Sequence, residues 1–204
     1  MQFYNRVTQA PAKLAILPGA FNPPTLAHLA MAESALSVVD EVLFVLPRAF
    51  PHKEYSGAGF DTRVQLLRAA LAGNLRFSLA SSDRGLFIEM AREARVDYGA
   101  ATQLYILCGR DAAERIVNWD YGGGDNIEKQ LEVFELLIAA RGGHYVPPPP
   151  IRNRVRSIAL PAGIEEISST EVRRRIGAGE PWHDLVPGPV ARLIERRMDL
   201  WLGG

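Results

Sequence analysis

Short apolar runs alternate with amphipathic stretches along the chain, and this alternation constrains the fold more than any other feature. The apolar runs predict strands at Lys13–Leu17, Glu41–Leu46, Leu75–Ala80, Gln103–Cys108, Glu135–Ala140 and Val155–Leu160. The stretches with helical character predict helices near Leu26–Val38, Asp61–Ala72, Leu86–Arg95, Asp111–Val117, Ser169–Gly177 and Pro189–Leu200. Strands that alternate with helices form a parallel sheet covered on both faces, so we expect a Rossmann-like, doubly wound α/β fold.

Length, charge and cysteine content narrow the class of protein. The 204 residues, 48% of them apolar, suit one domain, with a core over about residues 13–177 and a C-terminal helical part over 178–204. The 23 basic and 23 acidic side chains cancel, which predicts neither a nucleic-acid partner nor a membrane partner. A single cysteine excludes an intramolecular disulfide and fits a reducing cytoplasm. Because Cys108 falls in a predicted buried strand, we interpret it as a core residue rather than a nucleophile.

Several further segments predict local features. Pro147–Pro150 should form extended polyproline II, ahead of the basic stretch Arg152–Arg156, which is either a solvated or a phosphate-facing edge. The glycine-rich residues 122–125 predict a loop. Arginines at 192, 196 and 197 stand among apolar positions near the C-terminus, so this helix packs either on its own core or on a partner in a homo-oligomer.

Residues 18–28, PGAFNPPTLAH, join the first predicted strand to the first predicted helix. Backbone N–H groups in the first helical turn have no partner within the helix and can face an anion, and Gly19 lets the backbone approach a ligand closely. Thr25 and His28 share one face of that turn. A hydroxyl and an imidazole there favour a phosphate site. The alternative is an ordinary turn capped by Thr25, with His28 on the surface.

The same residues carry a resemblance to a known family. Gly19 to His28 resembles the G-x-F-[DN]-P-x-[HT]-x-G-H motif of the nucleotidylyltransferase superfamily, whose members join a nucleoside triphosphate to a phosphate-bearing acceptor and release pyrophosphate. Three later segments resemble nicotinate-nucleotide adenylyltransferases in the same order along the chain. They are Leu46–Lys53 (LPRAFPHK), Leu104–Asp111 with the following Trp119, and Ile167–Arg173 (ISSTEVR).

Each later segment also has a purely structural interpretation. His52 and Lys53 put cationic groups at the carboxyl end of a predicted strand, but such a loop can be merely solvated. Asp111 suits a ribose diol and Trp119 a pyridine ring, or they are a helix cap and a core anchor. Ser168 can cap a helix that also binds phosphate, so these two roles are compatible.

The resemblance implies roles for individual residues. Those implied to be catalytic are His28, Thr25, Lys53 and Arg173. Those implied to bind ATP are Gly19, Ala20, Phe21, Asn22, Thr25, His28, Gly109, Asp111, Ser168, Ser169, Thr170 and Arg173. Those implied to bind the acceptor are Asn22, His52, Lys53 and Trp119. No protein metal site is expected, because Mg²⁺ would be held mainly by the phosphates of ATP.

The motif from Gly19 to His28 and the segment Leu104–Asp111 depart from the family pattern at several positions, which leaves alternatives open. Thr25 replaces the usual first histidine, Ala20 and Ala27 replace glycines, and Arg110 replaces the commoner alanine; the methyl group of Ala27 is expected beside the nucleotide. The leading hypothesis is transfer of AMP from ATP to nicotinate or nicotinamide mononucleotide, with release of pyrophosphate. One alternative is a nucleotidylyltransferase for a different phosphorylated acceptor, with either ATP or CTP as the donor. The other is a nucleotide-binding relative without catalysis.

Overall fold

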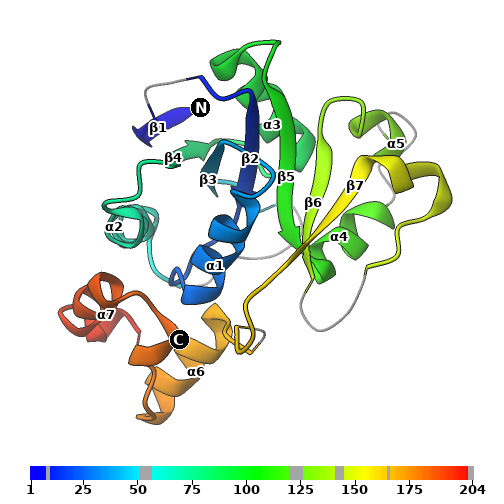
Figure 1. Cartoon of the computed structure of the whole chain (residues 1–204). Coiled ribbons are helices and arrows are strands. Elements are labelled where there is room, and N and C mark those ends of the chain that lie inside the picture. The colour runs from blue at the N-terminus through cyan, green and yellow to red at the C-terminus, as the bar shows by residue number, and fades with distance from the viewer. Residues whose placement is uncertain (8–9, 51–56, 120–125, 141–144, 165, 202–204) are drawn as a thin grey trace.

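The computed structural model describes residues 1–7, 10–50, 57–119, 126–140, 145–164 and 166–201. Its centre is a seven-stranded sheet in which the strands lie in the order β1-β4-β3-β2-β5-β6-β7 (Figure 1). Every neighbouring pair is parallel except β1 with β4. The strands are β1 Gln2–Asn5, β2 Lys13–Pro18, β3 Glu41–Pro47, β4 Phe77–Ser82, β5 Gln103–Gly109, β6 Glu135–Ala140 and β7 Val155–Ala159.

The strand order confirms the predicted Rossmann-like fold. From β2 the chain builds outward through β3 and β4, then returns to the other side of β2 and builds outward through β5, β6 and β7. This is the order found in doubly wound nucleotide-binding folds. Because the direction of building reverses between β2 and β5, the connections that leave these two strands diverge and open a crevice at their carboxyl ends.

Helices cover both faces of the sheet, and their bounds differ in places from the prediction. They are α1 Leu26–Ala35, α2 Phe60–Leu71, α3 Phe87–Tyr98, α4 Arg110–Val117, α5 Ile127–Gln130, α6 Ser169–Ala178 and α7 Gly188–Glu195. The prediction of one helix over Pro189–Leu200 is wrong, because α7 ends at Glu195 and a separate 3-10 turn covers Met198–Leu200. The prediction of polyproline II through Pro150 is also wrong, because a 3-10 helix begins at Pro149.

The alternation of side chains along β2 explains why both faces are covered. Leu14 and Ile16 pack into a cluster with α3 and α4, while Ala15 and Leu17 pack into another with α1 and α2. All four are buried, which is why the sequence of this strand is one apolar run. A third cluster joins α6 and α7 to α1 and α2, at the lower end of Figure 1. The last helix therefore packs on its own core.

The first strand was not predicted, and β4 begins later than expected. The segment Gln2–Asn5 is short and half-exposed, so it has no apolar run, and it pairs antiparallel at the edge of the sheet. The apolar character of Leu75 predicts a place in the strand, but Leu75 is 86% exposed and lies before β4. No helix within the described residues is long and apolar enough to cross a membrane.

A buried carboxyl group lies at the start of β3. Glu41 is 1% exposed, and its Oε1 accepts hydrogen bonds from the hydroxyls of Ser78 (2.6 Å) and Tyr98 (2.7 Å). Burial raises the pKa of Glu41 above its usual value of 4.5, although both hydrogen bonds act in the opposite direction. At pH values between the unfolded and the native pKa of Glu41, the folded protein therefore holds a proton that the unfolded chain releases.

We expect Glu41→Gln to weaken the fall in stability with rising pH. A raised native pKa contributes stability that is full below about pH 4.5 and is lost as pH rises through the native pKa. Urea unfolding should be measured at a series of values from about pH 5 to about pH 8. Over this range the free energy of unfolding of the variant should rise relative to that of the wild type, by at most about 1.4 kcal/mol per pH unit. A difference that does not change with pH would mean that Glu41 ionises normally.

Candidate functional site

Two adjoining hollows lie at the carboxyl ends of β5, β2 and β3. The larger has a volume of about 590 Å³, and its lining includes His28 of α1 together with Gly109 and Asp111 after β5. The smaller, of about 190 Å³, is lined by residues that follow β2 and β3, including Gly19 and Ala20. Residues of three predicted segments thus meet at the crevice that the strand order creates. We call the two hollows together the cleft.

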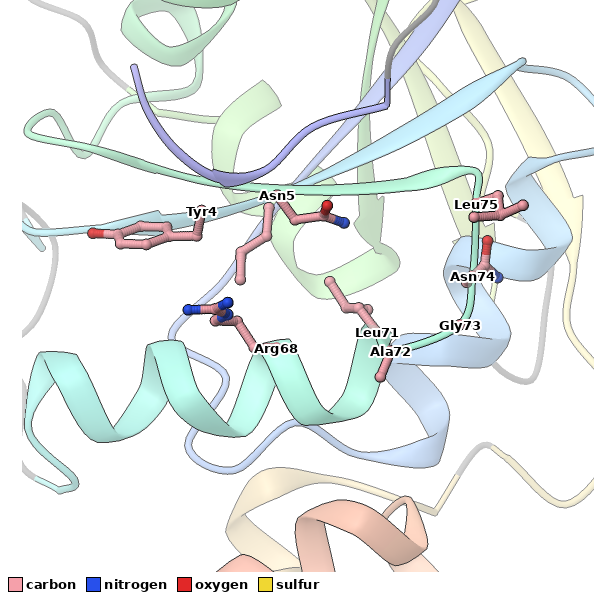
Figure 2. Close-up of a pocket in the computed structure, with 9 residues that line it drawn as sticks. Tyr4, Asn5, Arg68, Leu71, Ala72, Gly73, Asn74 and Leu75 are labelled. Atoms are coloured by element: carbon pink, nitrogen blue, oxygen red, sulfur yellow. The ribbon is translucent and has the colours of Figure 1, made fainter.

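A separate hollow lies at the β1 edge of the sheet and is not part of the cleft. Its volume is about 290 Å³, and it lies between the end of α2 and the strands β1 and β4. Figure 2 shows Arg68 rising from α2 toward the strand that carries Tyr4 and Asn5, with Leu75 at the far end. None of the residues predicted for function lines it. The cleft is therefore the candidate site.

His28 is oriented by the residue that caps its own helix. The backbone N–H of Thr25 donates to Nδ1 of His28 at 3.0 Å, and the Thr25 hydroxyl lies 2.8 Å from the same nitrogen. Since Nδ1 accepts a hydrogen bond, the neutral ring carries its proton on Nε2 and offers an N–H donor there. Thr25 itself is fully buried, so its hydroxyl serves His28 rather than lining the cleft.

Phe21 supports the loop from the core. Its backbone has φ of 47°, its side chain is 2% exposed, and its ring meets that of His28 edge-on at 5.0 Å. A Cβ on Gly19 would lie 2.9 Å from the Phe21 ring, so this position needs glycine. Phe21 is predicted to bind ATP, and its ring is packed against Phe44. Only its backbone is left to contact a nucleotide.

The start of α6 is tied to the same loop. Ser169 donates through Oγ to the carbonyl of Pro23 at 2.8 Å, and Arg173 donates through Nη1 to the carbonyl of Asn22 at 2.7 Å. These contacts join residues 146 and 151 positions apart in the sequence. The first and fourth predicted segments are therefore in direct contact.

The one acidic side chain of α6, Glu171, pairs with arginines other than Arg173. Ser168 caps the helix by accepting from the backbone N–H of Glu171, and the Glu171 carboxylate binds Arg174 and Arg175. These two arginines lower the pKa of Glu171 to about 2. Thr170 is exposed in the first turn, where a phosphate could meet its hydroxyl.

A buried arginine that the sequence did not suggest also supports the loop. Arg63 of α2 is 3% exposed and donates through Nη1 to the carbonyl of Ala20 at 3.1 Å. Its guanidinium also lies near the rings of Phe50 and Phe60. The side chain of Asn22 is 4% exposed and accepts from the backbone N–H of Ala58, so it too is used within the protein.

The residues that follow β5 exclude two structural alternatives, namely Asp111 as a helix cap and Trp119 as a core anchor. The residue that caps α4 is Gly109, so Asp111 is not a helix cap; its side chain is exposed in the first turn. Trp119 follows α4, is 44% exposed and is not a core anchor, and it is not among the residues that line either hollow. Burial raises the pKa of the Cys108 thiol to about 12, which keeps it protonated and unreactive.

Some predicted residues lie elsewhere. His52 and Lys53, like the glycine-rich residues 122–125, lie outside the described residues. Arg156 pairs with Glu135 at 2.9 Å at the amino ends of β6 and β7, away from the cleft. The phosphate-facing interpretation of this basic stretch is therefore wrong for Arg156, and the solvated edge is the better description.

Known proteins resemble this chain over nearly its full length. The cytidylyltransferase-like family model matches residues 16–175. A protein of Moorella thermoacetica named "Probable nicotinate-nucleotide adenylyltransferase" is 31% identical over 95% of this chain and 93% of its own length. One of the same name from Exiguobacterium sibiricum is 29% identical over 90% and 96%. The structure of Plasmodium falciparum nicotinic acid mononucleotide adenylyltransferase complexed with APC has a TM-score of 0.73 at 19% identity, covering 92% of this chain and 98% of that one, and so shares the fold.

We expect Arg63→Met to destabilise the protein by about 1–3 kcal/mol, because the carbonyl of Ala20 loses its buried donor. Methionine keeps much of the side-chain volume, so the loss reports the hydrogen bond more than a cavity. Arg68→Met, on the same helix but exposed, is the matched control and should change stability by less than about 0.5 kcal/mol. Equal urea midpoints for the two variants would contradict a supporting role for Arg63.

Proposed function

Because the chain belongs to the cytidylyltransferase-like family and is a nucleotidyltransferase, we propose that it transfers AMP from ATP to nicotinate mononucleotide and releases pyrophosphate. The observation that carries the proposal is the oriented imidazole of His28, which lines the same hollow as Gly109 and Asp111. The names of the similar proteins support the choice of nucleotide and acceptor.

The reaction is a substitution at phosphorus. A phosphate oxygen of the mononucleotide forms a bond to the α-phosphorus of ATP, and the bond from that phosphorus to the oxygen of the leaving pyrophosphate breaks. No covalent bond to the enzyme is needed, so the protein contributes by positioning two anions and stabilising the charge that develops. In our proposal, Nε2–H of His28 donates to an α-phosphate oxygen as the transition state forms.

The remaining residues divide into those that contact substrate and those that hold the loop. In this proposal Asp111 binds the ribose diol, and the exposed Thr170 and the first-turn amides of α6 bind the outer phosphates. Ser169 and Arg173 already donate to the loop carbonyls, so their main task is to position the loop. Thr25 acts through His28, and it is a positioning residue.

Mg²⁺ would be held mainly by the substrate. Within the described part of the chain, no group of three or more histidine, cysteine or carboxylate residues could hold a metal. Among the described carboxylates that line the cleft, Glu114 binds Arg110 at 2.6 Å, and Asp111 is assigned to the ribose in this proposal. Bound to phosphate oxygens, Mg²⁺ would offset the charge on the departing pyrophosphate.

The first test is pyrophosphate release with Mg²⁺ and either ATP or CTP, each with nicotinate mononucleotide, nicotinamide mononucleotide or no acceptor. We expect release that requires ATP and an acceptor, and that has a higher kcat/KM with nicotinate mononucleotide than with nicotinamide mononucleotide. Release with CTP in place of ATP would overturn the choice of donor. The absence of release with either pyridine nucleotide would overturn the choice of acceptor. ATP binding without any release would instead indicate a nucleotide-binding relative without catalysis.

We expect His28→Ala to lower kcat by about 10²–10³-fold with little change in KM for either substrate, because the lost hydrogen bond is strongest in the transition state. His28→Gln, which places an amide donor near the position of Nε2, should recover part of the loss. Steady-state kinetics and thermal melting of both variants provide the measurement and the folding control. Unchanged kcat in His28→Ala would remove this residue from the mechanism.

A further inference from the structure

The side chains that line the smaller hollow are mostly apolar, and one of those in the described residues carries a charge. Its lining includes the rings of Phe50 and Phe87 and the side chain of Met90, with proline, glycine and alanine around them. Among its described lining residues, Arg115 of α4 is the only one with an ionisable side chain. Apolar walls with one well-placed polar group are typical of sites that bind a flat ligand in a single orientation.

Neighbouring carboxylates do not neutralise Arg115. Glu114 accepts from Arg110 instead, at 2.6 Å. Asp111 lies one helical turn earlier, but within the part of the chain that the structure describes no ion pair joins it to Arg115. The Arg115 side chain is exposed at the cleft, so its guanidinium can form a bidentate contact with an anionic ligand.

Arg115 also lies where the two hollows meet. Together with Pro18 and Phe87, it lines both of them. The other charged or titratable residues of the described lining belong to the larger hollow alone: His28, Cys108, Arg110, Asp111 and Glu114. A molecule that reached from the larger hollow into the smaller one would therefore meet one cation at the entrance and apolar walls beyond it.

We propose that Arg115 determines the choice of acceptor by binding the carboxylate on the pyridine ring of nicotinate mononucleotide. This inference rests on the proposed function and adds a specificity-determining residue to it. The ring lies between the apolar walls of the smaller hollow, and the guanidinium donates two parallel hydrogen bonds to the carboxylate. The carboxamide of nicotinamide mononucleotide is neutral, and its NH₂ group is a donor, so it cannot accept two such bonds. The enzyme therefore prefers the carboxylate.

Because Arg115 also lines the larger hollow, a contact with a phosphate group is the competing role. Both acceptors carry the same phosphate, so losing a phosphate contact would weaken both to the same extent. Losing a carboxylate contact would weaken only the nicotinate substrate. The ratio of kcat/KM for the two acceptors therefore separates the two roles.

The experiment measures kcat/KM for both acceptors in the wild type, Arg115→Gln and Arg115→Lys. We expect Arg115→Gln to lose about 10- to 100-fold in kcat/KM for nicotinate mononucleotide, chiefly through KM, with little change for nicotinamide mononucleotide. Arg115→Lys keeps the charge without the planar fork and should retain part of the preference. Arg92→Gln, exposed on α3 and outside both hollows, is the matched control and should behave as the wild type.

The outcomes separate this inference from the proposed function. A wild type that uses neither pyridine nucleotide refutes the proposed function, and this inference with it. A wild type that prefers nicotinate mononucleotide, with the same preference in Arg115→Gln, overturns the role of Arg115 alone. Equal losses for both acceptors assign Arg115 to a phosphate and also overturn the proposal. Thermal melting of each variant shows whether a loss reflects the site or the fold.

Discussion

The parallel pairing of β2 with β5 is the constraint on which the cleft depends. Leu14 to Ile16 lie in register with Leu104 to Ile106, so the two strands end side by side. The helices that follow them cover opposite faces of the sheet, because α1 contributes to one core cluster and α4 to the other. The connections must therefore diverge, and residues as distant in sequence as His28 and Asp111 line one hollow.

Side-chain donors then determine which groups of the first loop face the cleft. The carbonyls of Ala20, Asn22 and Pro23 accept from side chains of α2 and α6. A carbonyl oxygen directed at a phosphate would repel it, so holding these three oxygens against protein donors keeps negative partial charge away from the anion. Arginine suits this task because its planar guanidinium remains charged when it is partly or wholly buried. Helix α6, in the C-terminal part of the chain, thus contributes to the site by orienting the backbone of the first loop.

The parts of this arrangement that follow local patterns could be predicted from the sequence. The six strands from β2 to β7 and the helices α1 to α4 follow from apolar runs and helical stretches, because a sheet covered on both faces leaves a clear signal. The four-residue helix α5 was not predicted, since it is too short to show a helical pattern. The edge strand β1 could not be predicted, since a four-residue, half-exposed strand carries no such pattern. Arg63 could not be separated from Arg68 either: both are arginines on α2, and only the packing of the helix shows which one is buried.

The sequence predicts which residues belong to the candidate site, but it does not predict which of them face a ligand and which hold the loop in place. Motif resemblance selected Thr25, Phe21 and Arg173 as ATP contacts, and it cannot distinguish a side chain that contacts a ligand from one that holds its neighbours. That distinction depends on contacts such as the bond from Arg173 to the carbonyl of Asn22, which spans 151 residues. The roles of these residues toward a substrate remain predictions.

The departures from the family motif become understandable once the loop is seen in its surroundings. The methyl group of Ala27 was expected beside the nucleotide, but Ala27 is fully buried and packs in the cluster formed with α6 and α7. Its extra carbon therefore fills core space and takes no room from a ligand. Thr25 retains the backbone donor that orients His28 and adds a hydroxyl at 2.8 Å from the same ring nitrogen. Because neither change reaches the donor that Nε2 offers, the altered motif is compatible with catalysis. The third departure, Ala20, lines the smaller hollow together with Arg115, so it bears on the choice of acceptor rather than on catalysis.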